Sequence, residues 1–289
     1  MDIREFENSF KVVAKKEYVL EFQSKNEFDK VEDLKELIGH SDLSYDQLKT
    51  LTFENRKKKL RVFYHLLKDI DGLREKYRIK YEIQNGEEHV WHHFLKINDW
   101  IIGLNSDLRF IRDLLDEQKV GIENSKGRQS PSVDLLGVFE FTTLIELKYS
   151  STEIFKKLKS KGRANTWDLT ADFIEGISQC LGQKSELERS FDSKVFVKED
   201  NTRLTKDGIE NIDPKSILVI GNKKNEFPIN KNENTNILKN ITLERFRRNS
   251  RNVDVITFDE LFERAFHIVY SKKLSESWYW DEEANIFME

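Results

Sequence analysis

The chain has 289 residues, and its 48 Lys and Arg against 52 Asp and Glu give a formal net charge of −4 at pH 7. Hydrophobic residues make up 38% of the chain without any long uninterrupted apolar run, which excludes membrane-spanning helices. The 20 Phe, 8 Tyr and 5 Trp are enough for a folded core, which excludes gross disorder. Because the charge balance is near neutral, any basic surface for nucleic acid must be local.

Residues 1–84 are predicted to form a smaller N-terminal region of a strand and helices. Short apolar runs rich in β-branched and aromatic residues predict a strand or hairpin over 10–22. Apolar residues at a spacing of about 3.6 then predict helices over 28–80. The turn dipeptide Asn85-Gly86 marks a boundary, so the second predicted domain is 85–289.

The second region alternates between strand-like and helix-like segments. The expected elements are a helix over 87–98, paired strands over 133–139 and 143–149, a helix over 168–183, strands over 194–197, 216–220 and 253–258, and a helix over 259–270. This order predicts an α/β fold, in which helices cover a mixed sheet.

The start of the chain and its single cysteine indicate a cytoplasmic protein. The first residues, from Met1 to Glu7, lack the apolar segment of a secretory signal. Cys180 cannot form an internal disulfide, which is typical of a reducing compartment. Its apolar helical surroundings favour a packing role over a nucleophilic one.

Three residues around the paired strands carry the chemistry. Glu146 and Lys148 lie two apart on one predicted strand and so share a face, whereas Ile145, Leu147 and Tyr149 are expected to point into apolar packing. A hairpin between the paired strands can bring Asp134 beside Glu146. Two carboxylates and an amine suit metal-assisted phosphodiester hydrolysis. An ordinary surface Glu–Lys pair is the alternative.

The segment from Asp134 to Lys148 resembles the D…(D/E)xK core of restriction-endonuclease-like PD-(D/E)xK nucleases. In addition, EEHVWHHFLKINDWIIG, VDLLGVFEFTTLIELKYS, DFIEGISQCLG, SILVIGN and ERFRRNSRNVDVITFDELFERA follow the order found in the Shedu (SduA) anti-phage defence family, over about residues 85–270. This resemblance implies a C-terminal nuclease domain with a restriction-endonuclease-like mixed sheet. It also implies a variable N-terminal region that regulates the nuclease or selects DNA.

Site residues follow from the resemblance by position, with Mg²⁺ or Mn²⁺ as the implied cofactor. The residues are Glu88 as an additional acid, Asp134 and Glu146 as metal ligands, the backbone carbonyl of Leu147 as a third ligand, Lys148 as the catalytic lysine, and Gln179 near the active site. The chain departs from the family pattern twice. Pro131 is not adjacent to Asp134, and the tyrosine often found after the glutamine is missing.

Basic residues near and after this motif are candidate DNA contacts. They are Lys156, Lys157, Lys159, Lys161 and Arg163, and then Lys223, Lys224, Arg245, Arg247 and Arg248 in the asparagine-rich stretch 222–251. A flexible, basic, amide-rich segment suits contacts with phosphates. A solvated loop without a DNA role is an equal alternative for 222–251.

The function expected from these observations is a metal-dependent DNA endonuclease of a Shedu-type defence system. The expected partners are DNA, further copies of the chain as a homo-oligomer, suspected to be a tetramer, and a phage component as trigger. The alternatives are an inactive DNA- or partner-binding module on the same scaffold, and a resolvase or restriction nuclease outside antiviral defence. A zinc site at His89 and His93 is disfavoured because no third ligand is evident.

Overall fold

The structure is a computed structural model, and its two compact units are Met1–Arg61 and Val62–Glu289. It describes residues 45–102, 113–120, 131–138, 141–157, 166–198, 202–204, 206, 209–227, 233–271 and 274. The strand or hairpin expected over 10–22 lies outside these residues. The boundary expected near residue 85 stays a prediction, although helices before it belong to the second unit.

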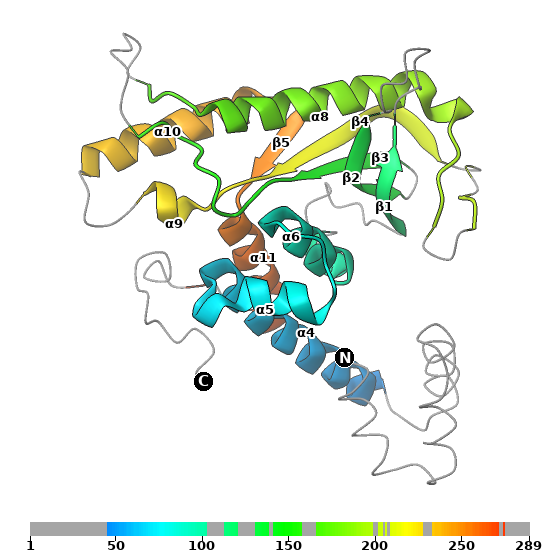
Figure 1. Ribbon diagram of the computed structural model, residues 1–289, viewed down its shortest axis with the longest axis horizontal. Coiled ribbons are helices and arrows are strands. Elements are labelled where there is room, and N and C mark those ends of the chain that lie inside the picture. The colour runs from blue at the N-terminus through cyan, green and yellow to red at the C-terminus, as the bar shows by residue number, and fades with distance from the viewer. Residues whose placement is uncertain are drawn as a thin grey trace. The chain divides into compact units, whose positions relative to one another are not determined.

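A five-stranded mixed sheet is the centre of the second unit, as Figure 1 shows. Its strands are β1 (Asp113–Lys119), β2 (Ser132–Val138), β3 (Phe141–Leu147), β4 (Glu210–Val219) and β5 (Val253–Ile256), in the spatial order β1-β2-β3-β4-β5. The first three strands are antiparallel neighbours, whereas β3 with β4 and β4 with β5 are parallel. The predicted mixed α/β fold is confirmed.

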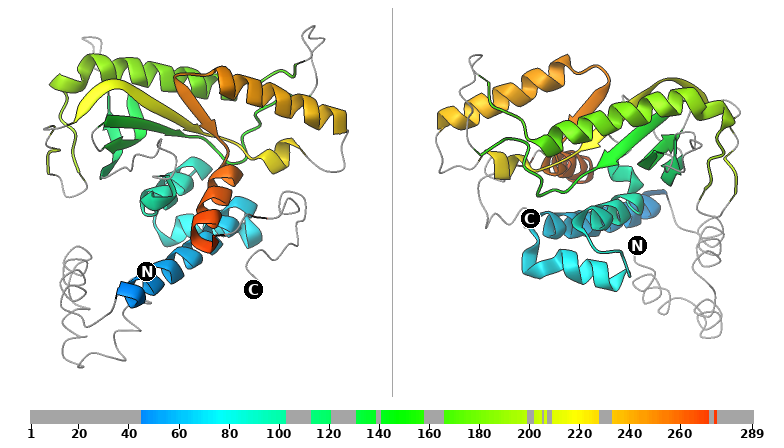
Figure 2. Two further views of the ribbon diagram at one scale, coloured as in Figure 1. Left: turned by 180° about the vertical axis from the view of Figure 1, so that it is seen from behind. Right: turned by 45° about the horizontal axis from the view of Figure 1, so that its top comes forward.

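Helices cover both faces of this sheet, as expected for its parallel part. The described helices are α4 (Tyr45–Lys68), α5 (Leu73–Lys80), α6 (Glu87–Lys96), α7 (Asp99–Ile102), α8 (Ala171–Ser190), α9 (Lys223–Glu226), α10 (Glu233–Asn249) and α11 (Phe258–Tyr270), with short 3-10 helices at Ile70–Gly72 and Phe191–Ser193. Both views of Figure 2 place α8 and α10 on one side of the sheet and α6 and α11 on the other.

The sequence of α8 explains its close packing on the sheet. Thr170 caps its first turn by accepting a hydrogen bond from the backbone N–H of Phe173 at 3.2 Å. A side chain at Gly176 would place its Cβ 3.1 Å from Leu218 of β4, so a glycine lets the helix approach the strand. The helix continues to Ser190, beyond its expected end at 183.

The face opposite α8 rests on an aromatic cluster. Trp91 and Phe94 of α6 pack with Phe63 of α4 at ring-centroid distances of 5.4 Å, and Phe63 meets Phe262 of α11 at the same distance. All four are buried, and the apolar face predicted for the helix over 87–98 is confirmed. These contacts hold the start of α6 near the ends of the central strands.

Three local expectations differ from the structure. The predicted strand over 194–197 is wrong, because Val197 makes only an isolated bridge with Arg203. Strand β1 was not predicted, because its acidic residues obscure the alternation of an edge strand. The described parts of 222–251 are largely helical, as α9 and α10, rather than a flexible loop.

No helix among the described residues has the length and apolar character needed to cross a bilayer.

Candidate metal centre

The register of the β2–β3 hairpin brings two carboxylates together. Leu135 pairs with Ile145 and Leu136 with Leu144, so the same register extended by one residue places Asp134 opposite Glu146. The Oδ2 atom of Asp134 accepts a hydrogen bond from the backbone N–H of Leu147 at 2.7 Å. That bond holds the Asp134 carboxylate beside the end of β3.

A third carboxylate reaches the same place from α6. Glu88 lies in the first turn of α6, and carboxylate oxygens of Glu88, Asp134 and Glu146 all lie within 4.8 Å of one another. One turn further along α6, Nε2 of His92 lies 3.1 Å from the backbone oxygen of Asp134. The start of α6 is thereby tied to β2, and the positive end of its helix dipole favours the nearby negative charge.

Lys148 lies next to Glu146, on the side of the sheet that α8 covers. Its Nζ is 2.8 Å from Oε1 of Glu146, whose side chain is only 1% exposed. This burial is incompatible with an ordinary surface pair. Ile145 and Leu147 are buried as expected, but the prediction that Tyr149 is packed is wrong: it is 44% exposed, because the strand ends at Leu147.

Two glutamines on α8 bind the two partners of this ion pair. The Nζ of Lys148 donates to Oε1 of Gln179 at 2.9 Å, so the structure brings Gln179 into the site. One turn later, Nε2 of Gln183 donates to Oε2 of Glu146 at 2.7 Å and to the backbone oxygen of Ser132 at 2.8 Å. The sequence reasoning missed Gln183. The available signal was its spacing of four from Gln179, which places the two side chains on one face of a helix.

Burial and mutual repulsion set the charge states of the cluster. Burial and the charge of Glu146 raise the pKa of Asp134 to about 7, against the lowering effect of the Leu147 hydrogen bond. Burial also raises the pKa of Glu146, and the bonds from Lys148 and Gln183 only partly offset it. For Lys148, burial would lower the pKa, but the carboxylates around it raise it on balance. Lys148 is therefore an ammonium group.

The backbone carbonyl of Leu147 lies on the edge of β3 that faces β2. The peptide between Leu147 and Lys148 is trans, and the N–H of Lys148 donates to Val219 of β4 at 2.9 Å. Because the N–H and C=O of a trans peptide point in opposite directions, the carbonyl of Leu147 points away from β4 and towards β2. Asp134 lies on that side.

The donor set fits a hard divalent cation. Carboxylate and carbonyl oxygens are the ligands of Mg²⁺ and Mn²⁺ in proteins, and a cation would offset the repulsion that raises the carboxyl pKa values. Oε1 of Gln183 is buried without a partner among the described atoms, so the polar requirements of the site are incompletely met by protein groups alone. Among the residues that the structure describes, this is the one group of three acidic, His or Cys side chains with metal-binding spacing.

Two histidines of α6 lie next to other residues of this part of the chain. Nδ1 of His93 lies 3.0 Å from the hydroxyl of Tyr77, and its ring packs against Tyr81 with centroids 4.9 Å apart. His89 lies one turn earlier, beside Gly86.

The basic residues after β3 are exposed where the structure describes them. Lys156 lies 3.9 Å from Asp168, and Lys157 lies 3.2 Å from Glu153. Both lysine side chains are more than half exposed, so both ammonium groups can exchange these partners for phosphates. The remaining candidates of this segment lie outside the described residues, namely Lys159, Lys161 and Arg163.

The second basic set is divided between surface and interior. Arg245 and Arg248 are exposed on α10. Lys223 pairs with Glu260, and the ammonium of Lys224 is buried. These lysines are thus poorly placed for phosphate contacts.

Arg247 is paired with acidic residues of two helices. Its guanidinium makes a two-pronged contact with Glu260, at 2.8 and 2.7 Å, and reaches Glu244 at 3.1 Å. Its side chain is 15% exposed. Acidic residues of α10 and α11 thus occupy its donors, and the assignment of Arg247 as a phosphate contact stays a prediction.

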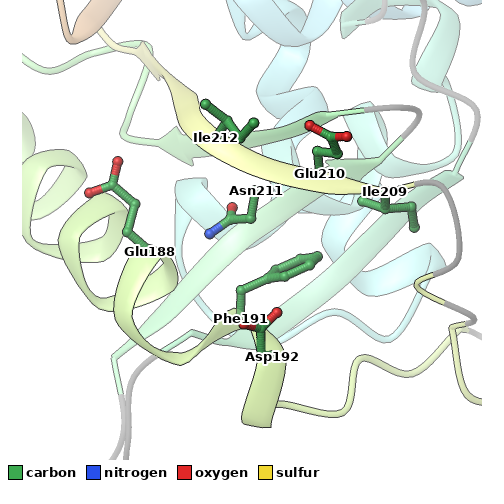
Figure 3. A pocket seen from close by; sticks show the side chains of 7 residues that line it. All are labelled: Glu188, Phe191, Asp192, Ile209, Glu210, Asn211 and Ile212. Atoms are coloured by element: carbon green, nitrogen blue, oxygen red, sulfur yellow. The ribbon is translucent and has the colours of Figure 1, made fainter.

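A pocket of about 340 Å³ lies at the other end of the central strands (Figure 3). It is lined by Glu188, Phe191, Asp192, Ile209, Glu210, Asn211 and Ile212. Phe141, at the start of β3, pairs with Glu210, whereas Glu146 pairs with Leu218 near the end of β4. The pocket is therefore separated from the carboxylates by most of the length of the strands.

Comparison with known proteins identifies the family. The family model described as "Shedu protein SduA, C-terminal" matches residues 85–262. A Shedu protein SduA of Bacillus cereus (strain B4264) is 28% identical over 188 residues, which cover 63% of this chain and 46% of that relative. The chain thus spans about half the length of this curated relative. Because the matched segment is more than half of the chain, the chain belongs to the Shedu SduA family through its C-terminal part.

Proposed function

We propose that this chain is a metal-dependent DNA endonuclease of a Shedu-type anti-phage defence system, built on a PD-(D/E)xK core. One observation carries the proposal: the carboxylates of Glu88, Asp134 and Glu146 lie within 4.8 Å, with the ammonium of Lys148 2.8 Å from Glu146. Perturbed carboxyl pKa values beside a half-buried lysine are typical of catalytic sites. Family membership supports the defence role.

Glu88, Asp134 and Glu146 would hold Mg²⁺ or Mn²⁺, together with the backbone carbonyl of Leu147. A bound divalent cation supplies Lewis acidity and a water molecule of lowered pKa. The ionised carboxylates determine when the site is competent, since protonation of Asp134 removes one ligand. Cleavage should therefore increase as the pH rises towards the raised pKa of Asp134.

Lys148 contributes a positive charge rather than a base. The surrounding carboxylates raise its pKa, so its ammonium can offset charge that develops on a phosphodiester during attack by water. Gln179 orients the ammonium of Lys148, and Gln183 orients the carboxylate of Glu146. Exposed Lys156 and Lys157 follow on the same segment and would contact the DNA backbone.

Cleavage assays with matched variants test this function. Purified protein is incubated with linear, nicked, branched and supercoiled DNA in Mg²⁺ or Mn²⁺. Glu146→Gln and Lys148→Met should abolish cleavage, whereas Glu175→Gln, an exposed acid on α8, should retain it. Equal cleavage by all these proteins would show that another site acts. Preference for branched DNA would instead favour the resolvase alternative.

Calorimetry separates the nuclease from the inactive binding module. The nuclease requires Mn²⁺ binding that Asp134→Asn weakens, whereas a module without turnover can bind DNA with no cation. The same proposal includes a homo-oligomer, suspected to be a tetramer, and a phage component as trigger. Sedimentation of the intact chain with and without DNA tests the assembly.

A further inference from the structure

Glu87, in the first turn of α6, is the centre of a cluster that joins separate parts of the chain. Its Oε1 accepts hydrogen bonds from the N–H and hydroxyl of Ser150, at 2.8 and 2.5 Å, and from the indole of Trp91 at 3.0 Å. Its Oε2 accepts from the hydroxyl of Ser151 at 2.7 Å and pairs with Arg74 at 2.9 Å. Both carboxylate oxygens are thus fully engaged in contacts between elements.

Arg74 extends the cluster to the preceding helices. It lies on α5, and its guanidinium donates to the backbone oxygens of Leu66 and Leu67 at 2.7 and 3.1 Å, and to the hydroxyl of Ser150 at 3.0 Å. Leu66 and Leu67 lie in the last turn of α4, where backbone oxygens have no partner within the helix. One side chain therefore links α4, α5, α6 and the turn after β3.

The cluster is built for an ionised Glu87. Burial alone would raise the pKa of Glu87, but the hydroxyls of Ser150 and Ser151 and the charge of Arg74 lower it on balance. Successive helix residues are about 100° apart around the axis. Accordingly, α6 offers Glu87 to the turn after β3 and the next residue, Glu88, to the carboxylate site.

We propose that Glu87, with Arg74 and Ser150, positions the reacting groups of the site. The cluster sets the distance between Glu88 on α6 and Lys148, which precedes Ser150 by two residues. On its other side this segment is bound to β4 and the loop after it, through the backbone bonds of Lys148 and Tyr149. Glu87 binds the same segment to α6 through its hydrogen bonds with Ser150 and Ser151. The inference rests on the proposed function, since Glu88 and Lys148 act in that reaction.

The physical reason is the precision that such chemistry requires. A misplacement of about 1 Å can reduce a rate by about 100-fold, even when the altered residue does not touch the substrate. Glu87 touches no group of the carboxylate cluster through a described contact. Its removal should therefore lower turnover and cation affinity and leave DNA binding unchanged.

Glu87→Gln tests the proposal, with Glu75→Gln as its matched control. Glu75 also pairs with an arginine of α5, at 2.6 Å from Arg78, but it is exposed. Glu87→Gln should lower kcat and weaken Mn²⁺ binding by about 10- to 100-fold, with KM for DNA unchanged, as for partners that orient metal ligands. Glu75→Gln should match the parent protein in all three measurements. Assays are run well below the melting temperature of each protein.

The outcomes distinguish this role from the proposed function. A parent protein that neither cleaves DNA nor binds Mn²⁺ overturns the proposed function. If the parent is active and Glu87→Gln has the same kcat and Mn²⁺ affinity as Glu75→Gln, the positioning role alone is overturned. The same conclusion follows if Glu87→Gln has a lower melting temperature but an unchanged kcat and Mn²⁺ affinity. If Glu87→Gln does not fold, Ser151→Ala removes one donor at an exposed residue and should lower kcat measurably; parent-like kcat there also overturns the role.

Discussion

Replacing Asp134 by Asn should stabilise the metal-free protein, and the gain should depend on pH. The Asp134 carboxyl has its pKa raised from 3.8 to about 7, mainly by burial and by the charge of Glu146. The folded state therefore binds a proton that the unfolded state releases, and ionisation opposes folding. This penalty is absent below the unfolded pKa, grows as the pH rises from about 4 to 7, and is constant above.

The magnitude follows from the two pKa values. One pKa unit corresponds to about 1.4 kcal/mol, so the full penalty is about 4 kcal/mol at pH 8 and less than about 2 kcal/mol at pH 5. Asn keeps an oxygen that can accept the N–H of Leu147, so this hydrogen bond is preserved. Asp134→Asn should exceed the parent protein in free energy of unfolding by these amounts.

Urea denaturation at pH 5 and pH 8 measures the difference, with tryptophan fluorescence as the signal. Glu175→Gln, an exposed acid on α8, is the control and should match the parent at both values. Adding Mg²⁺ should then stabilise the parent more than Asp134→Asn, because a ligand that binds the folded state stabilises it. A variant less stable than the parent at pH 8, or a gain equal at both pH values, would refute the reasoning.

Three further changes test other parts of the structure. Lys148→Met should destabilise the protein by about 3 kcal/mol in urea at pH 8, because buried Glu146 loses its cationic partner. Arg247→Met should lower stability by a similar amount of about 3 kcal/mol without changing DNA affinity in fluorescence anisotropy, because it breaks the pair with Glu260. The pair with Arg247 lowers the pKa of Glu260 from 4.5 to about 2, against the opposing effect of burial. The free energy of unfolding that the pair contributes, measured by urea denaturation, should therefore decline as the pH falls from 4.5 towards 2. Gly221→Ala should lower the melting temperature, because φ is +68° there and a Cβ would lie 2.8 Å from a backbone oxygen.

Asp134 and Glu146 could be located from the sequence because their placement relative to each other is a local property. Strand residues alternate between faces, and a short hairpin fixes which residues lie opposite each other. Asp134, Glu146 and Lys148 belong to one hairpin and its continuation, so spacing alone brings them together. The strand over 216–220 was likewise evident, because a buried parallel strand is a continuous apolar run.

The glutamine contacts depend on how a distant helix packs. Gln179 and Gln183 reach Lys148 and Glu146 only because α8 lies close over β3 and β4, where Gly176 permits a near approach. Helical periodicity identifies a polar residue on a helix but not the strand residue that it meets. Gln183 was therefore missed, although its spacing from Gln179 is one helical turn.

Basic composition likewise leaves the role of each basic residue open. Arg247 and Arg248 are neighbours in sequence, yet Arg247 is half-buried and paired with Glu260, whereas Arg248 is exposed. The partner of Arg247 lies on the next helix, beyond β5, and no local pattern connects the two residues. The structure must therefore distinguish exposed cations from paired cations before DNA contacts inferred from a basic segment are tested.

The site also shows why stability alone would not retain this cluster. Repulsion and burial raise the carboxyl pKa values of Asp134 and Glu146, so the metal-free site opposes folding at neutral pH. Yet donors from α8 and β3 hold these carboxylates in place, and Glu87 fixes the helix that brings Glu88 to them. A use for their charge explains why groups that are costly for folding are still held so precisely, and the use that we propose is to bind a cation beside Lys148.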